Sequence, residues 1–217
     1  MATTSGGYEW RTPCNAPGAM MTPMAAPQLA TYDDLLAFTD PENKRAELIH
    51  GVIVPRVGPA GEHGSTQMRL GTWVGRRFDR AHGERWPGGW WFASESDLQY
   101  ETHEVFCHDL MGWRRERMPE RPQGRPLRMA PDWACEIISP STEKRDFIDK
   151  MPVLHRAGVP YFWIVRPIEK TLLVHRWTPD GYVVRTAAAS ADVVRAEPFE
   201  AVELRVAVMF GDEDDDE

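Results

Sequence analysis

Two short apolar runs of this chain each contain one acidic residue. Residues 105–111 and 133–138 have the length and composition of strands that are covered on both faces, and Asp109 and Glu136 interrupt them. An unpaired buried charge costs roughly several kcal/mol, so a chain that keeps one must compensate for it. A divalent cation shared by acids on neighbouring strands would do so, and oxygen ligands suit Mg²⁺ or Mn²⁺. The alternative is a separate ion pair for each acid, with an arginine or with Lys150.

A helix-like segment follows the second run. Residues 143–157 have a helical pattern, and Pro152 must either kink this helix or mark a new start. Lys150 could then reach back over the strand end toward Glu136, hold an attacking water and offset the charge of a phosphate. The simpler alternative is an ion pair between Asp146 and Lys150, which are four residues apart on one helix face.

The connection between the two runs is long and rich in arginine. Residues 112–131 contain six arginines and four prolines, and a link of this length within a compact domain is usually functional or disordered. Guanidinium groups match phosphate oxygens. Arg114 and Arg115, which we expect nearest the metal carboxylate, are therefore the candidate nucleic-acid contacts. A solvated loop balanced by its own glutamates, Glu116 and Glu120, is the alternative.

The other periodic segments are one amphipathic helix, one hairpin around a His-Gly turn, and three further strands. They cover residues 62–81, 45–54, 161–165, 171–177 and 182–184. The order of helix, strands, helix and strands predicts a mixed α/β sheet in one domain over residues 29–210. Residues 1–28 read as a flexible leader.

The charge of the chain is concentrated at its end. Residues 211–217 hold six of the acids behind the net charge of −8, so the body is nearly neutral. A terminal run of like charge predicts a solvated, disordered tail. The alternative is a strip that mimics phosphate and screens a basic groove of the same protein.

Several classes of protein are excluded by composition. An apolar run of about 18 residues, as a membrane span needs, does not occur in the sequence. The first thirty residues lack the pattern of a secretory signal, so we expect a cytoplasmic protein. The three cysteines are far apart, which excludes a disulfide framework and a CxxC-type zinc site.

Several motifs in the chain carry a family resemblance. They are His108 to Pro119, Ala130 to Thr142, Asp146 to Lys150, Ala157 to Val159, and Ala46 to Gly51, which is similar to a "YELIDG" segment. Together they closely resemble the Uma-two family of endonucleases, in the PD-(D/E)XK, restriction-endonuclease-like superfamily. The resemblance implies a restriction-endonuclease-like core, in which helices flank a central mixed β-sheet, with a C-terminal β-hairpin extension.

The resemblance also implies site residues. Asp109 takes the place of the first acid of the superfamily and Glu136 that of the second, and the main-chain carbonyl of Ile137 would complete the metal ligands. The residue two beyond Glu136 is Ile138 rather than the usual lysine. Lys150 on the following helix is then the substitute.

Further residues stand near these positions in the family. Glu47 would be a third carboxylate near the metal or a structural residue of the hairpin. His63 and Asp146 are additional candidates. Asp132 precedes Glu136 by four residues on one strand, which separates them by about 13 Å, so one ion cannot join both. We therefore place Asp132 at the start of the strand, outside the metal site.

The resulting hypothesis is an endonuclease, dependent on Mg²⁺ or Mn²⁺, that hydrolyses DNA phosphodiester bonds through a metal-bound water. DNA is the expected partner, and a homodimer is left open. The alternative is a catalytically inactive nuclease-fold protein that binds nucleic acid or a protein partner. A serine hydrolase that uses Ser139 or Ser141 with His155 is disfavoured, because the sequence has no G-x-S-x-G motif.

Overall fold

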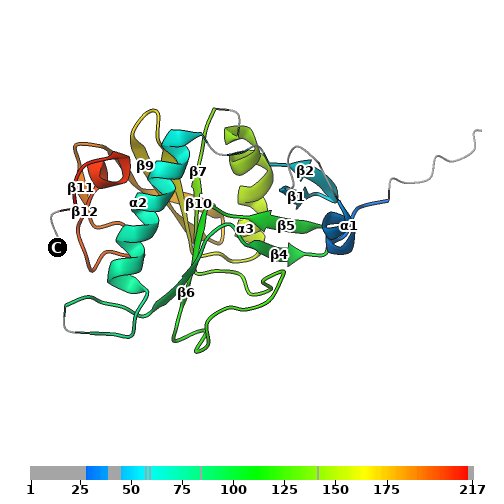
Figure 1. Ribbon diagram of the computed structural model, residues 1–217, viewed down its shortest axis with the longest axis horizontal. Helices are drawn as coiled ribbons and strands as arrows, with labels where there is room; N and C mark the ends of the chain where they lie inside the picture. The colour runs from blue at the N-terminus through cyan, green and yellow to red at the C-terminus, as the bar shows by residue number, and fades with distance from the viewer. Residues whose placement is uncertain are drawn as a thin grey trace, which may run out of the picture.

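The computed structural model describes residues 28–38, 45–56, 58, 60–83, 85–140 and 142–214, which form two large adjacent β-sheets, a small two-stranded sheet and several helices (Figure 1). In spatial order, the six-stranded sheet consists of β10 (Gly181–Ala189), β9 (Thr171–Thr178), β8 (Tyr161–Arg166), β7 (Trp133–Ile137), β6 (Leu110–Arg114) and β3 (Trp90–Ala93). Its β7 and β8 are parallel, whereas the other neighbours are antiparallel. This is the predicted mixed sheet, and β9 and β10 form its C-terminal hairpin.

The second sheet has four strands. In spatial order they are β2 (Val52–Pro55), β1 (Ala46–Ile49), β5 (Glu104–Cys107) and β4 (Asp97–Glu101). The predicted hairpin is confirmed, because Ile49 pairs with Val52 across a two-residue turn. His50 and Gly51 both have positive φ, +51° and +74°, as the common two-residue hairpin turn requires.

Helices cover both faces of the six-stranded sheet. They are α2 (Gly61–Phe78), the π-helix η1 (Arg145–Lys150), α3 (Met151–Arg156) and the 3₁₀-helix η2 (Val206–Phe210), whereas α1 (Tyr32–Ala37) packs on the four-stranded sheet. The apolar stripe of α2 is confirmed: Leu70, Trp73, Val74 and Phe78 are buried in one core cluster. On the other face, α3 contributes to a second cluster. Because both faces are covered, β7 is buried along its whole length.

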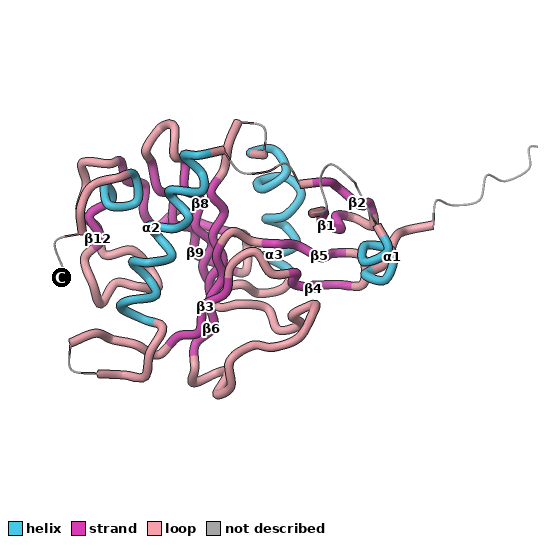
Figure 2. The backbone as a smooth tube through the Cα atoms, in the orientation of Figure 1, coloured by secondary structure: helices cyan, strands magenta, loops and turns pink. Residues whose placement is uncertain are grey.

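The predicted strand over residues 105–111 is in fact two strands in different sheets. β5 ends at Cys107, and β6 begins at Leu110, so the chain crosses from the four-stranded to the six-stranded sheet at His108 and Asp109 (Figure 2). The chain from β3 to β4 makes the reverse crossing beside it, where the N–H of Glu95 donates to the carbonyl of His108. Apolar composition cannot show this break, since both halves are buried.

Gly112 of β6 provides a test of this packing. A Cβ at this position would lie 2.9 Å from Cε1 of Phe92 and 3.2 Å from Cε3 of Trp90. Both rings pack against Phe199, with centroid distances of 5.9 Å and 5.1 Å. We expect Gly112→Ala to lower the free energy of unfolding by about 1–3 kcal/mol in urea denaturation, because the core is already filled.

The matched control is Gly75→Ala in α2. A Cβ there meets no atom within 4 Å, and alanine is the better helix former, so stability should rise by up to about 1 kcal/mol. Equal effects of the two substitutions would contradict the packing described for β6.

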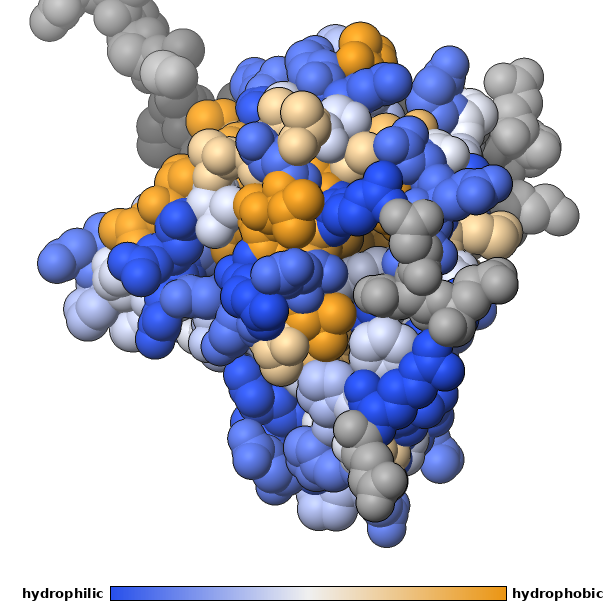
Figure 3. Space-filling model, turned by 90° about the vertical axis from the view of Figure 1, so that its left-hand side faces the viewer, coloured by the Kyte–Doolittle hydropathy of each residue, from blue (hydrophilic) through white to orange (hydrophobic). Residues whose placement is uncertain are grey.

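The ends of the domain are only partly described. The predicted leader lies outside the described residues except for residue 28, as do residues 215–217 of the predicted tail. Within the tail, Asp214 Oδ1 is 2.8 Å from the guanidinium of Arg77. On the side of the molecule with β11 (Val193–Val194) and β12 (Leu204–Arg205), apolar patches are bordered by hydrophilic side chains (Figure 3). Among the described helices, none has the length and apolar character of a membrane span.

Candidate active site

Asp109 lies where the two sheets meet, opposite Glu136 of the neighbouring strand. β6 and β7 are antiparallel and Leu110 pairs with Cys135, so extending this register by one residue places Asp109 opposite Glu136. Directly opposed residues in such a pair have Cα atoms about 5 Å apart. Oδ2 of Asp109 accepts a 2.7 Å hydrogen bond from the N–H of Ile137, and both acids are buried. The structure thus brings together the two acids singled out in the sequence.

Glu136 has two polar partners in the interior. Its Oε1 accepts a hydrogen bond of 3.0 Å from Nζ of Lys150 and lies 2.6 Å from Nδ1 of His108. The other ring nitrogen of His108 is 2.7 Å from the hydroxyl of Tyr100, so a neutral imidazole that donates to Glu136 can accept from Tyr100. Burial alone would raise the pKa of Glu136, but the Lys150 ammonium and His108 hold it well below its usual range. Glu136 is therefore ionised.

Lys150 is buried among three acids. Its Nζ lies 2.8 Å from Glu47, 3.0 Å from Glu136 and 3.3 Å from Asp146. Burial lowers the pKa of an ammonium group, yet the carboxylates of Glu136 and Glu47 hold the pKa of Lys150 above its usual range. Both contacts predicted for Lys150 occur: the ion pair with Asp146 and the contact with Glu136. The segment is a π-helix, η1, whose wider turn buries both Asp146 and Lys150.

Two oxygens of the buried acids make no hydrogen bond but lie near a cation: Oε2 of Glu47 is 3.7 Å from Nε of Arg145, and Oδ1 of Asp146 is 3.3 Å from Nζ of Lys150. Burial raises the pKa of Asp146 to about 6 and also raises that of Asp109. Four buried acids, Glu47, Asp109, Glu136 and Asp146, offer carboxylate oxygens, the ligand type that hard divalent cations take. By residue type they fit the metal ion implied by the resemblance, with Asp109 and Glu136 as the opposed pair.

A second group adjoins Asp109 on the side of α2. Nε2 of His63 is 3.1 Å from Oδ1 of Asp109, and His63, Glu95 and Asp109 each offer one ligand atom within 4.8 Å of the other two. Burial lowers the pKa of His63, but the hydrogen bond to Asp109 raises it above its usual value. Glu95 is not among the site residues predicted from the sequence. It lies in the short segment between β3 and β4, where the sequence pattern does not mark it as a ligand.

Arg114 and Arg115 lie at the far end of β6 from Asp109. A strand rises about 3.3 Å per residue, which places Arg114 roughly 16 Å from Asp109. Arg115 is ion-paired with Asp79 at 3.3 Å and stacks on Trp91, with its guanidinium carbon 3.4 Å from the ring centroid. The expectation that these arginines lie nearest the carboxylate is wrong, because β6 runs away from the site.

Other arginines of residues 112–131 anchor that loop to the body of the protein. Arg117 pairs with Asp132, Arg121 with Asp79 and Arg125 with Asp97, and Arg128 donates to Gln99. The alternative of a loop balanced by Glu116 and Glu120 therefore does not hold for these four side chains, whose partners lie elsewhere. Asp132, directly before β7, forms an ion pair with Arg117 of the loop and does not belong to the acidic cluster around Lys150.

Comparison with known proteins agrees with this architecture. The sequence profile of the Uma2 family, described as "Putative restriction endonuclease", matches residues 29–208. The crystal structure of a protein from Anabaena variabilis, described as a "putative nuclease belonging to DUF820", is similar with a TM-score of 0.64 and 20% sequence identity. The match covers 83% of this chain and 97% of that one. The sequence has no match among curated proteins. With a profile match over most of its length, the chain belongs to the Uma2 family.

Proposed function

We propose that this protein is a metal-dependent endonuclease that hydrolyses phosphodiester bonds of DNA. The observation that carries the proposal is the opposed pair Asp109 and Glu136, with the ammonium of Lys150 3.0 Å from Glu136. Membership in a family of restriction-endonuclease type supports the reaction class. Neither acid is neutralised by a guanidinium alone, since Glu136 has Lys150 and His108 as its partners and Asp109 also contacts His63.

Asp109, Glu136 and the carbonyl of Ile137 would hold Mg²⁺ or Mn²⁺. The bound cation would supply positive charge that stabilises the scissile phosphate as its negative charge grows. Glu136 contributes a carboxylate whose charged form is favoured, because Lys150 and His108 lower its pKa against the effect of burial. Asp109 is fixed by its hydrogen bond from the main chain of β7.

Lys150 combines positioning with charge compensation. Its three N–H groups face three acids, and the contact with Asp146 is the longest. A water or a phosphate oxygen can replace that contact, while Glu47 and Glu136 keep the ammonium group in place. The role assigned to Lys150 is therefore to orient the attacking water and to fix Glu136.

Arg114 is the better of the two predicted DNA contacts. Arg115 is engaged with Asp79, whereas Arg114 has no ion pair with any described residue and lies over the ring of Trp90 at 4.7 Å. At roughly 16 Å from Asp109 it would contact a phosphate several nucleotides from the cleaved bond, which adds affinity rather than sequence information. A homodimer stays a prediction.

One observation favours the second candidate, a protein that binds nucleic acid or a partner without cleavage. Lys150 and Arg56 already lie against the acids that would ligate a metal, at 3.0 Å from Glu136 and 3.5 Å from Asp109. A site whose charges are compensated internally can be stable without metal uptake.

Nicking of supercoiled plasmid separates the two candidates. With Mg²⁺ or Mn²⁺ present, the wild-type protein should convert the plasmid to nicked and linear forms, and Glu136→Gln should not. Glu104→Gln is the matched control, because Glu104 is also a buried acid but is bonded to His50. Equal nicking by wild type and Glu136→Gln, or none by either, would contradict the proposed reaction.

A further inference from the structure

We propose that Arg69 and Arg77 of α2, together with Arg205 of β12, form a binding site for phosphates of the DNA backbone, and that the acidic C-terminal tail occupies this site as a phosphate mimic. The site contains none of the acids of the proposed active site. The inference rests on the proposed function only for the choice of DNA as the ligand.

The tail contacts all three arginines. Three consecutive residues of it each face a different guanidinium: Asp212 accepts from Arg69 through its carbonyl at 3.1 Å, Glu213 accepts from Arg205 through its carbonyl at 3.5 Å, and Oδ1 of Asp214 lies 2.8 Å from NH2 of Arg77. One short segment thus spans guanidinium groups from two separate elements of the fold.

Arg77 is the fixed centre of this site. Its guanidinium carbon lies 5.0 Å from the ring centroid of Trp73 and 4.9 Å from that of Trp86, and its side chain is 1% exposed. These aromatic contacts hold the guanidinium in place and exclude water, which strengthens its attraction to an anion. Guanidinium groups bind phosphate oxygens with the same geometry as the carboxylate oxygens of residues such as Asp214.

The rest of the tail is held weakly enough to be displaced. Arg69 and Arg205 donate to its main-chain carbonyls, which carry no net charge. The ion pair of Arg205 with Asp212 is 3.9 Å long, and both side chains are exposed. Exposed ion pairs of this kind contribute little to stability. Phosphates of a DNA strand, with one negative charge each, could therefore take the place of the tail.

The composition of the tail suits it to compete with DNA. Six of its seven residues, 211–217, are acidic. Because the tail is part of the same chain, its effective concentration at the site is high. The strip that mimics phosphate, one of the two alternatives that the sequence leaves open for this segment, is the one that these contacts favour.

Helix α2 connects this site to the proposed active site. His63 in its first turn contacts Asp109 at 3.1 Å, and Arg77 lies in its last turn. At 1.5 Å per residue these positions are about 21 Å apart along the helix, the length of about six base pairs. A duplex that follows α2 could place one phosphate near Asp109 and another at Arg77.

Fluorescence anisotropy of a labelled DNA duplex, in EDTA, measures binding without cleavage. A full-length variant in which the six acids of residues 211–217 are replaced by their amides should bind about tenfold tighter than the wild type at low salt. The logarithm of its association constant should also fall more steeply with the logarithm of the salt concentration, by a slope of about three, because three further guanidinium groups reach phosphates.

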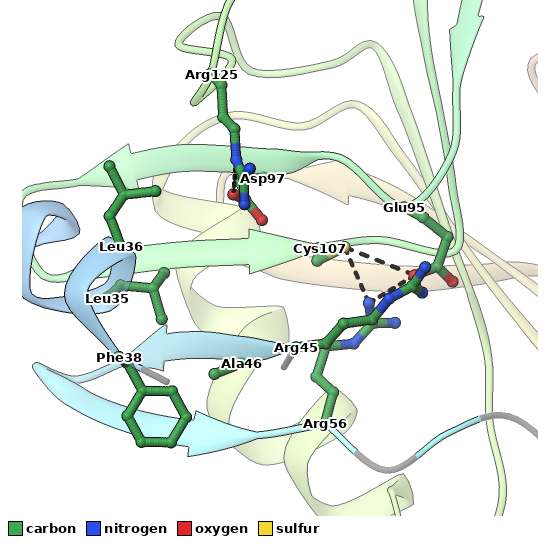
Figure 4. A pocket seen from close by; sticks show the side chains of 10 residues that line it. All are labelled: Leu35, Leu36, Phe38, Arg45, Ala46, Arg56, Glu95, Asp97, Cys107 and Arg125. Carbon is green, nitrogen blue, oxygen red and sulfur yellow. Dashed lines mark hydrogen bonds and ion pairs between the residues drawn. The ribbon is translucent and has the colours of Figure 1, made fainter. Parts of the chain in front are cut away.

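Arg69→Gln combined with Arg205→Gln tests the site itself. In this background the amide tail should improve binding by less than about threefold, because the two effects are coupled. Arg125→Gln combined with Arg156→Gln is the matched control, since it removes the same charge from arginines that pair with acids of β4 (Figure 4 shows Arg125). The tenfold gain should persist in the control.

Equal affinity of the wild type and the amide variant would overturn the site. An equal gain in the Arg69→Gln, Arg205→Gln protein would overturn it as well, because the tail would then repel DNA by its charge alone. Neither result depends on metal or on cleavage, so plasmid nicking by the wild type would still support the proposed function. Circular dichroism of each variant checks that the fold is retained.

Discussion

Replacing Lys150 with methionine should lower the free energy of unfolding by about 3–5 kcal/mol, the usual cost of removing one partner from a buried charge cluster. Methionine retains much of the side-chain volume, so packing is nearly preserved. The carboxylates of Glu47 and Glu136, however, would lose the ammonium that lies 2.8 Å and 3.0 Å from them. Urea denaturation followed by tryptophan fluorescence measures the change.

Two further variants show that charge, rather than volume, is responsible. Lys144→Met removes an exposed ammonium six residues away and should change stability by no more than about 0.5 kcal/mol. Glu47→Gln combined with Lys150→Met should recover part of the loss, since one buried charge is removed with its partner. A Lys150→Met protein as stable as the wild type would show that the three acids are not held by this ammonium.

Asp109→Asn should reduce metal-dependent cleavage by about 10³-fold or more, equivalent to about 4 kcal/mol of transition-state stabilisation. Its stability should be equal to or higher than that of the wild type, because burial and the neighbouring Glu136 raise the pKa of Asp109 and so disfavour its charge. Initial rates of plasmid nicking and urea denaturation give the two quantities.

Asp132→Asn is the informative contrast, because Asp132 also lies in a Pro-Asp sequence that precedes Glu136. Its carboxylate accepts hydrogen bonds from Arg117 and from the main-chain N–H of Arg114. We expect this variant to lose about 1–3 kcal/mol of stability, the cost of a weakened buried hydrogen-bond network, and to keep its cleavage rate. The reverse pattern would make Asp132, rather than Asp109, the catalytic acid.

Much of the acidic cluster could be predicted because its members break strong local patterns. Asp109 and Glu136 each stand out as a charge within an apolar run, and Lys150 follows on the next helical segment, in reach of Glu136. The amphipathic helix α2 and the β1–β2 hairpin follow from periodicity and from a turn that requires positive φ.

The missed features depend on contacts between distant segments. Glu95 lies in a serine-rich stretch with no apolar pattern, and it reaches Asp109 only because two chain crossings lie side by side. The arginine-rich loop looks like a phosphate-binding segment, yet Arg117 and Arg125 pair with acids of the body that no local pattern connects to them. Similarly, an α-helical spacing places Asp146 and Lys150 on one helix face, but not in the interior where the π-helix directs them.

The most direct test is an anomalous-difference map from a crystal soaked in Mn²⁺. A peak that lies about 2.0–2.6 Å from an oxygen of Asp109 and from an oxygen of Glu136 would bear out the proposal that these acids share a cation. A fully soaked crystal with no such peak, or with Mn²⁺ bound to only one of the two acids, would contradict it.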